Sequence, residues 1–421
     1  MTLDSFETRP RAGGGAGRTA ALIALLMAGQ LVPASAAGAD VITSWNGTVN
    51  AIGGPQIQRT WAMVHLAMFD AVNAIEGGYT PYQAALPAPA IGASSEAAAA
   101  AAAHGVLVRL FPARAADFAA ALAVSLSTVP DGAAETSGVA FGDAVAAALY
   151  AARLDDNMLA AGPIYTSTNE PGDYQRTPGA PPQPVNTGAP GWRPFALANA
   201  SQFRPSGPPQ LGSGRYAQDL DETRRLGVSV GSERTPDQDL IGRWHTEQGQ
   251  FQFNRIARTE LAGDGGSILE HARLLALLNM ALADAITAVF DAKYTYRYWR
   301  PVTAIRRAEE DGNAHTSPDT TWTPFLPTPP HPEYPAAHGA GQGAGARVMK
   351  AYFGPHHAFL ATSASVPGAV RSFTNFDAFA DDGAAARIYG GMHFRNSTEV
   401  GLRMGTKVAN WVLQHYLLPL P

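Results

Sequence analysis

The 421-residue chain contains no cysteine and carries a formal net charge of −5. Without cysteine it can form neither disulfides nor thiolate metal sites. A mildly negative charge gives no basis for a nucleic-acid partner, and we expect none. The length permits two or three domains, although a helical enzyme can use such a length as one unit.

Residues 1–36 have the layout of a secretory signal peptide. Basic residues between positions 9 and 18 precede an apolar run at residues 20–32, and small residues follow at positions 34–36. This order is typical of an export signal, with an uncleaved membrane anchor as the alternative. The run is short for a bilayer span, and no later stretch looks long and apolar enough to be one. We therefore expect an exported protein, periplasmic or secreted, without a stable membrane span.

Helical periodicity dominates the remainder, and alternating strand patterns are scarce, which predicts an all-α fold. We expect an N-terminal helical bundle at residues 37–160 and a C-terminal helical domain at residues 216–421. The sequence DAVNAI at residues 70–75 resembles DAITAV at residues 284–289. This internal similarity favours two pseudo-repeated four-helix-type bundles, with the chemistry in the second.

Residues 161–215 differ in composition from both predicted bundles. They are rich in Pro, Gly, Asn and Ser, with scattered aromatic residues. A long segment of this kind inside a compact protein is usually functional or mobile. We interpret it as an irregular excursion that lies over the helices near a site; a flexible linker between two bundles is the alternative.

The sequence DAKYTYRYWRP at residues 291–301 contains three basic residues. We expect a helix here that Pro301 terminates, which would place Lys293, Arg297 and Arg300 on one face. Stacked like charges repel unless an anion or a carboxylate neutralises them. The motif therefore indicates an anion site, although a solvated basic face is the commoner explanation for such a trio.

A second motif, HPEYPAAHGAG, begins at His331. Pro335 suits the first position of a new helix, and the small residues after it allow close backbone approach. A helix start offers unpaired N–H groups and partial positive charge, both favourable to an anion. His338 would lie in that first turn as a candidate proton donor, or alternatively as a packing histidine.

A third motif runs from Arg387 to His393. Gly390 and Gly391 should end the helix that carries Arg387, and residues 396–399 look like the cap of the final helix. His393 would then stand on the break between two helices. A neutral imidazole there could serve as a metal ligand or as a nucleophile toward phosphorus.

The order and spacing of the three motifs resemble those of the vanadium-dependent haloperoxidases and the type 2 phosphatidic acid phosphatase superfamily. The matching elements are Lys293 followed by Arg300-Pro301, then Pro335-Ala336-Ala337-His338, then Arg387 followed by His393. The segment from Thr60 also resembles the first core helix of bacterial haloperoxidase-like proteins.

The resemblance implies a cofactor and a set of roles. Lys293, Arg300, Arg387 and the N–H of Ala337 would bind vanadate, and the same site would also accept phosphate. His393 would be the vanadium ligand, or the phospho-acceptor in a phosphatase, and His338 the general acid/base. Implied partners are hydrogen peroxide, halide, a small organic acceptor and a second copy in a homodimer. At the position of His331, the brominating members of the family resemble this chain. The resemblance therefore favours bromide over chloride.

Departures from the family pattern keep other functions open. Ala336 and Ala337 replace serine and glycine, so one hydroxyl donor to the oxyanion is missing. Ser397 stands where the phosphatases carry an aspartate that orients the last histidine. The leading hypothesis is a vanadate-dependent haloperoxidase. The alternatives are an exported acid phosphatase that uses a phosphohistidine, and a catalytically silent oxyanion-binding protein.

Overall fold

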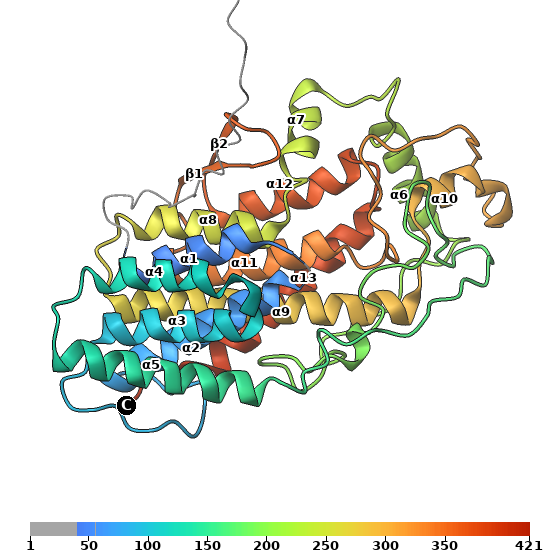
Figure 1. The fold of residues 1–421 in the computed structure, drawn as a ribbon. Coiled ribbons are helices and arrows are strands. Elements are labelled where there is room, and N and C mark those ends of the chain that lie inside the picture. Colours follow the sequence, from blue (N-terminus) through green and yellow to red (C-terminus); the bar gives the residue numbers. More distant parts are fainter. Residues whose placement is uncertain (1–39, 55) are drawn as a thin grey trace, which may run out of the picture. The chain divides into compact units, whose positions relative to one another are not determined.

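The structure is a computed structural model that describes residues 40–54 and 56–421. The predicted signal peptide lies outside the described residues. Those residues belong to one compact unit, and their regular secondary structure is helical apart from two short strands, which confirms the all-α prediction. The N-terminal helices are α1 (Val41–Ile52), α2 (Ile57–Glu76), α3 (Ser95–Leu110), α4 (Ala115–Leu126) and α5 (Ala133–Ala152) (Figure 1).

The C-terminal half carries the remaining helices and one small sheet. Strands β1 (Phe359–Thr362) and β2 (Val370–Phe373) pair antiparallel, with Phe359 opposite Phe373. The helices are α6 (Gly214–Leu226), α7 (Pro236–Trp244), α8 (Gly249–Leu261), α9 (Ile268–Tyr296), α10 (Pro301–Arg306), α11 (Ala337–Phe353), α12 (Phe376–Tyr389) and α13 (Arg395–His415). Short 3₁₀ turns occupy Pro112–Arg114, Ala189–Gly191 and Ala308–Glu310.

Helix α9 is the central element of the C-terminal half. It begins at a capping box in which Ser267 and Glu270 satisfy each other's backbone N–H groups. It packs against α2 of the first group of helices and against α11 and α13 of the second (Figure 1). By length and composition it could cross a membrane, contrary to our expectation that no later stretch would qualify. Nearly all of its apolar window is buried by protein, as in a core helix.

Close helix packing depends on glycines at the contacts. A Cβ atom added at Gly142 of α5 would lie 2.1 Å from the Ala98 carbonyl oxygen of α3. A Cβ at Gly343 of α11 would lie 2.1 Å from the Leu402 oxygen of α13. These backbones approach closer than any side chain would allow.

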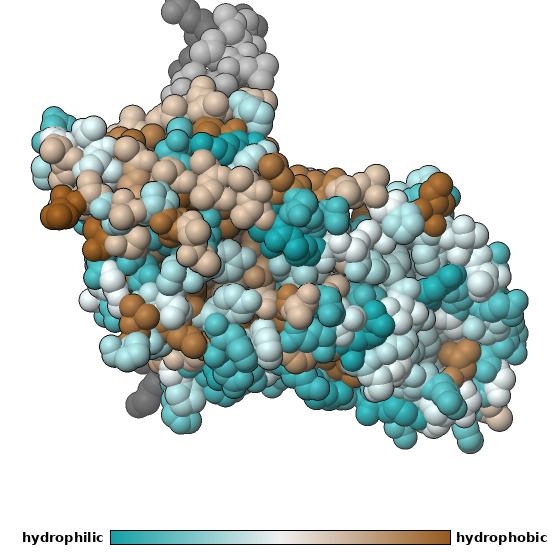
Figure 2. All heavy atoms as spheres, turned by 90° about the horizontal axis from the view of Figure 1, so that it is seen from below, coloured by the Kyte–Doolittle hydropathy of each residue, from teal (hydrophilic) through white to brown (hydrophobic). Residues whose placement is uncertain are grey.

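Figure 2 shows the face seen from below, where apolar residues gather in the left half and hydrophilic residues in the right half.

The two similar hexapeptides have equivalent structural roles. Asp70 of α2 accepts hydrogen bonds from the N–H groups of Tyr82 and Gln83. Asp284 of α9 accepts three, from the N–H groups of Phe195, Ala196 and Leu197. Each buried carboxylate thus fixes an irregular segment onto its helix.

The segment between α5 and α6 covers residues 153–213, and with them all of the predicted excursion at 161–215 except its last two residues, which belong to α6; it is held against α9. Besides the Asp284 contacts, Arg204 forms a bidentate ion pair with Asp291. The hydroxyl of Tyr334 donates to the Ser206 carbonyl at 2.5 Å. These contacts hold the segment against the helices, and its interpretation as an excursion near a site stays a prediction. The predicted boundaries at 160/161 and 215/216 stay predictions, and one buried cluster joins side chains from both sides of them.

Candidate active site

Lys293 and Arg300 reach the site from two different helices. Helix α9 ends at Tyr296, because Arg297 adopts a left-handed conformation with φ 54°. Pro301 is the first residue of α10, and Arg300 is its N-cap. The expectation of one helix ending at Pro301 is therefore wrong. Arg297 does not join the site; its Nε donates to Asp173 at 2.9 Å.

The segment just before α11 fixes both buried cations. The Lys293 Nζ donates to the carbonyl oxygens of Pro332 at 2.7 Å and Glu333 at 2.8 Å. The Arg300 Nε donates to the His331 carbonyl at 2.8 Å. Both side chains are fully buried. Burial and the neighbouring charge of Arg300 hold the pKa of Lys293 well below its usual value.

His393 lies next to these cations, on the break between α12 and α13, as predicted. Its Nε2 is 3.0 Å from an Arg300 guanidinium nitrogen, and its Nδ1 is 2.8 Å from the Glu333 Oε1. Burial, followed by the charges of Arg300 and Lys293, holds the pKa of His393 well below its usual value. We assign a neutral ring that donates from Nδ1 to Glu333, which leaves Nε2 unprotonated; its lone pair accepts from Arg300 here and would serve as a ligand or nucleophile once released from that hydrogen bond.

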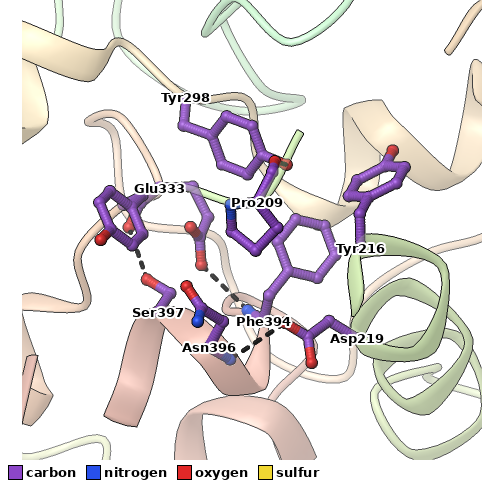
Figure 3. Close-up of a pocket in the computed structure, with 9 residues that line it drawn as sticks. Pro209, Tyr216, Asp219, Tyr298, Glu333, Phe394, Asn396 and Ser397 are labelled. Carbon is purple, nitrogen blue, oxygen red and sulfur yellow. Dashed lines mark hydrogen bonds between the residues drawn. The ribbon is translucent and has the colours of Figure 1, made fainter. Parts of the chain in front are cut away.

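Glu333 is the functional residue that sequence reasoning missed. Its carboxylate also accepts from the Phe394 N–H at 2.9 Å (Figure 3), and burial raises its pKa to about 7. Its second oxygen has no partner among the described residues. Glu333 lines a cavity of about 10 Å³, enough for one water molecule. The acidic residue between Pro332 and Tyr334, in an otherwise apolar stretch, was the sequence signal that could have identified it.

Ser397 does not take the place of the aspartate that orients the last histidine in the phosphatases, and it does not cap a helix. Helix α13 begins at Arg395 with Phe394 as its N-cap, so the predicted cap at residues 396–399 is wrong. The buried Ser397 hydroxyl donates instead to the Glu333 carbonyl at 3.4 Å. Because Glu333 supplies a carboxylate to the Nδ1 of His393, the serine does not count against a phosphohistidine.

Arg387 approaches the site from the last turn of α12, which ends at Tyr389 with Gly390 as its C-cap, so the glycines end this helix as expected. One guanidinium nitrogen donates to the His245 carbonyl at 3.4 Å, and another contacts the Met392 sulfur. Its Nε has no partner among the described residues. Burial, and then the charge of Arg300, lowers the pKa of Arg387 to about 9.

His338 lies in the first turn of α11, as predicted, with its Nε2 3.3 Å from the Glu247 carbonyl. The helix begins at Ala337, so Pro335 precedes it rather than opening it. Its N-cap, Ala336, supplies no side-chain cap. Burial, followed by the charge of Arg387, holds the pKa of His338 well below its usual value. His338 is therefore neutral beside an uncapped helix start.

His331 contacts Arg300 directly. Its Nδ1 is 3.0 Å from an Arg300 guanidinium nitrogen, and its ring meets the edge of Phe290 at 5.0 Å between centroids. Burial and the charges of Lys293 and Arg300 lower its pKa, so it is neutral and can accept from Arg300. Its role toward halide stays a prediction.

The charge balance of the site fits a bound oxyanion. Three buried cations, Lys293, Arg300 and Arg387, face one buried carboxylate, Glu333, and the uncapped start of α11 adds partial positive charge. Unpaired buried charge is costly, and a tetrahedral anion such as vanadate would neutralise it. Among the described residues no cluster of three or more His, Asp or Glu could bind a metal cation.

The chain is similar to vanadium-dependent enzymes. A family model for the VCPO second helical-bundle domain matches residues 273–419. The vanadium chloroperoxidase of Curvularia inaequalis is 25% identical over 192 residues, which cover 37% of this chain and 31% of that protein, about a third of its length.

Two solved structures extend the likeness to most of the chain. The first bacterial vanadium-dependent iodoperoxidase structure has a TM-score of 0.75 at 26% identity, covering 90% of this chain and 95% of that one. A holo-type bacterial vanadium-dependent chloroperoxidase has a TM-score of 0.70 at 19% identity, covering 90% and 94%. The latter likeness concerns the fold alone.

Proposed function

We propose, on the premise that the chain belongs to the vanadium-dependent haloperoxidase family, that it is a vanadate-dependent haloperoxidase that oxidises halide with hydrogen peroxide to hypohalous acid. One observation carries the proposal: the Nε2 of His393, oriented by Glu333, lies beside a buried trio of cations. That arrangement suits a tetrahedral oxyanion with one imidazole ligand.

The roles of the residues follow from their positions. Lys293, Arg300 and Arg387, with the N–H of Ala337, would bind the oxygens of vanadate. His393 would ligate the vanadium, and the neutral His338 would hold its proton at Nε2, toward the Glu247 carbonyl, and could accept another at Nδ1. Bound vanadate would supply a Lewis acid that activates peroxide toward halide.

A phosphatase is the second candidate, and the Glu333 contact supports it. A nucleophilic imidazole is more effective when a carboxylate orients it and stabilises the positive charge that develops on phosphorylation. The hydrogen bond of 2.8 Å between the Glu333 Oε1 and the His393 Nδ1 meets that need.

A paired assay series distinguishes the candidate functions. Protein loaded with orthovanadate is tested for peroxide-dependent bromination, and vanadate-free protein for phosphomonoester hydrolysis. Bromination that requires vanadate supports the haloperoxidase, hydrolysis inhibited by vanadate supports the phosphatase, and tight vanadate binding without turnover supports the silent binding protein. His393→Ala should abolish halogenation, whereas His356→Ala, at an exposed position, should not. Survival of halogenation in His393→Ala would remove the mechanism.

For the halide we propose bromide before chloride, on the basis of His331. The series should include iodide, because one similar structure is described as an iodoperoxidase. The ratio of kcat/KM for bromide to that for chloride tests the preference, and a ratio below one contradicts it.

We also propose that the protein is exported and forms a homodimer. The basic, apolar and small segments at residues 1–36 support export, and the family resemblance supports the dimer. Fractionation of expressing cells and light scattering of the purified protein test the two proposals; a cytoplasmic pool of full-length chain or a monomer would contradict them.

A further inference from the structure

Gln342 is a buried amide that the proposed mechanism does not use. It lies on α11, one helical turn after His338, so the two side chains share a helix face. The residue is fully buried, and neither its Nε2 nor its Oε1 has a hydrogen-bond partner among the described residues. A buried amide without partners is strongly disfavoured, so this one indicates a bound molecule.

Two glycines make room for this amide. A Cβ atom added at Gly383 of α12 would lie 2.6 Å from the Gln342 Nε2, and one added at Gly249, the first residue of α8, would lie 3.4 Å from it. Gly383 is one helical turn before Arg387 on α12. The amide is thus enclosed by backbone where α8, α11 and α12 meet.

The same place borders the candidate active site. The turn at residues 245–249 receives three side chains from the neighbouring helices. His338 Nε2 is 3.3 Å from the Glu247 carbonyl, and an Arg387 nitrogen is 3.4 Å from the His245 carbonyl. Gln342 meets the end of that turn at Gly249. The amide therefore lies beside the candidate acid/base and the Arg387 cation.

The chemistry of the amide restricts its ligand. It offers one unpaired acceptor and two unpaired donors. A halide or a fully deprotonated oxyanion only accepts hydrogen bonds and would leave the Gln342 oxygen without a partner. Water and hydrogen peroxide both donate and accept. We propose that Gln342 binds hydrogen peroxide beside His338, with water in its place when peroxide is absent; the peroxide assignment rests on the proposed function.

Gln342→Met tests the site by steady-state kinetics, because it keeps the size of the side chain and removes its hydrogen bonds. We expect the KM for peroxide to rise roughly tenfold, as for the loss of one or two hydrogen bonds, while the KM for halide and the affinity for vanadate change less than about twofold. Gln58→Met is the matched control and should change none of these values. Gln58 is also a buried glutamine, but it lies in α2, far from Gln342 in the sequence. An unchanged KM for peroxide in Gln342→Met overturns the proposal.

A crystal of the wild-type protein gives a readout that needs neither turnover nor a folded variant. We expect one ordered water within hydrogen-bond distance of both Gln342 amide atoms, replaced by two-atom density after a peroxide soak. A single water that the soak leaves unchanged, or no density at all, overturns the peroxide site. Because this result does not depend on halogenation, failure of the proposed function and failure of the Gln342 site are distinguishable.

Discussion

At the scale of single residues, the orientation of His393 depends on a side chain 60 positions away in the sequence, Glu333. The carboxylate holds the Nδ1 proton, and this leaves the Nε2 lone pair toward Arg300. Partners that orient a metal ligand in this way usually affect affinity strongly. Glu333 should therefore matter for vanadate binding although it does not face the oxyanion itself.

Glu333→Gln tests this dependence. Glutamine retains an acceptor for the Nδ1 proton but lacks the negative charge that strengthens the hydrogen bond, so we expect vanadate affinity to fall about 10- to 100-fold. Titration calorimetry with orthovanadate measures it. Ser397→Ala is the control, because its hydroxyl makes only a contact of 3.4 Å to the Glu333 carbonyl. Equal affinities for Glu333→Gln and wild type would show that Glu333 has no orienting role.

At the scale of elements, the positions of α11 and α13 depend on close backbone contact. Gly343 has no room for a Cβ, whereas a Cβ added at Gly341, on the same helix, would have nothing within 4 Å of it. Because His338 lies on α11 and His393 just before α13, separation of these helices would open the candidate site.

The two glycines of α11 form a matched pair for mutation. Gly343→Ala should lower the free energy of unfolding by about 2–4 kcal/mol, because the helices must move apart. Gly341→Ala should instead raise it by about 0.5–1 kcal/mol through helix propensity. Urea denaturation followed by circular dichroism measures both. Equal effects of the two substitutions would contradict the close contact.

Asp284 links α9 to the irregular segment in a pH-dependent way. Burial raises the pKa of its carboxyl to about 6, although three backbone N–H groups oppose the shift. The folded state therefore favours the protonated acid. The stabilisation that this provides is complete below the unfolded value of 3.8 and is lost as the pH rises through 6.

Comparison of wild type with Asp284→Asn isolates this contribution. The difference in unfolding free energy, wild type minus variant, should fall by roughly 1–3 kcal/mol between pH 4 and pH 7. Urea titrations at several pH values measure it. The exposed Asp131→Asn should show no such change with pH. A difference that grows with pH would reverse the sign and refute the assignment.

At the scale of the whole molecule, α2 and α9 join the two groups of helices through one continuous core. The buried Trp61 of α2 belongs to this core, and Trp299, also buried, to a smaller cluster just after α9. The two groups of helices bury their apolar faces against each other, and neither group alone would keep its face covered. Their unfolding is therefore coupled.

We therefore expect one cooperative unfolding transition. Tryptophan fluorescence and far-ultraviolet circular dichroism should give coincident urea curves. The seven tryptophans lie in both groups of helices, among them Trp61 in α2 and Trp411 in α13, so the fluorescence curve reports on both groups and should have the same midpoint as the circular dichroism curve. Two separated transitions would indicate independent bundles with boundaries near the predicted ones.

Much of the protein follows from the sequence alone. Helical periodicity predicts the all-α fold, and local signals place His338 in the first turn of α11 and Gly390 directly after the last residue of α12, because such signals act within a few residues. The repeated aspartates at positions 70 and 284 also mark equivalent positions, where each carboxylate fixes an irregular segment.

Only the tertiary structure determined which polar groups meet. Arg297 turns outward to Asp173, Glu333 contacts His393, and Gln342 is left without a partner among the described residues. Local patterns record the spacing along a helix, but a left-handed residue such as Arg297 redirects everything after it. Contacts between residues far apart in the chain depend on how the helices pack, and one-dimensional spacing contains no information on that packing.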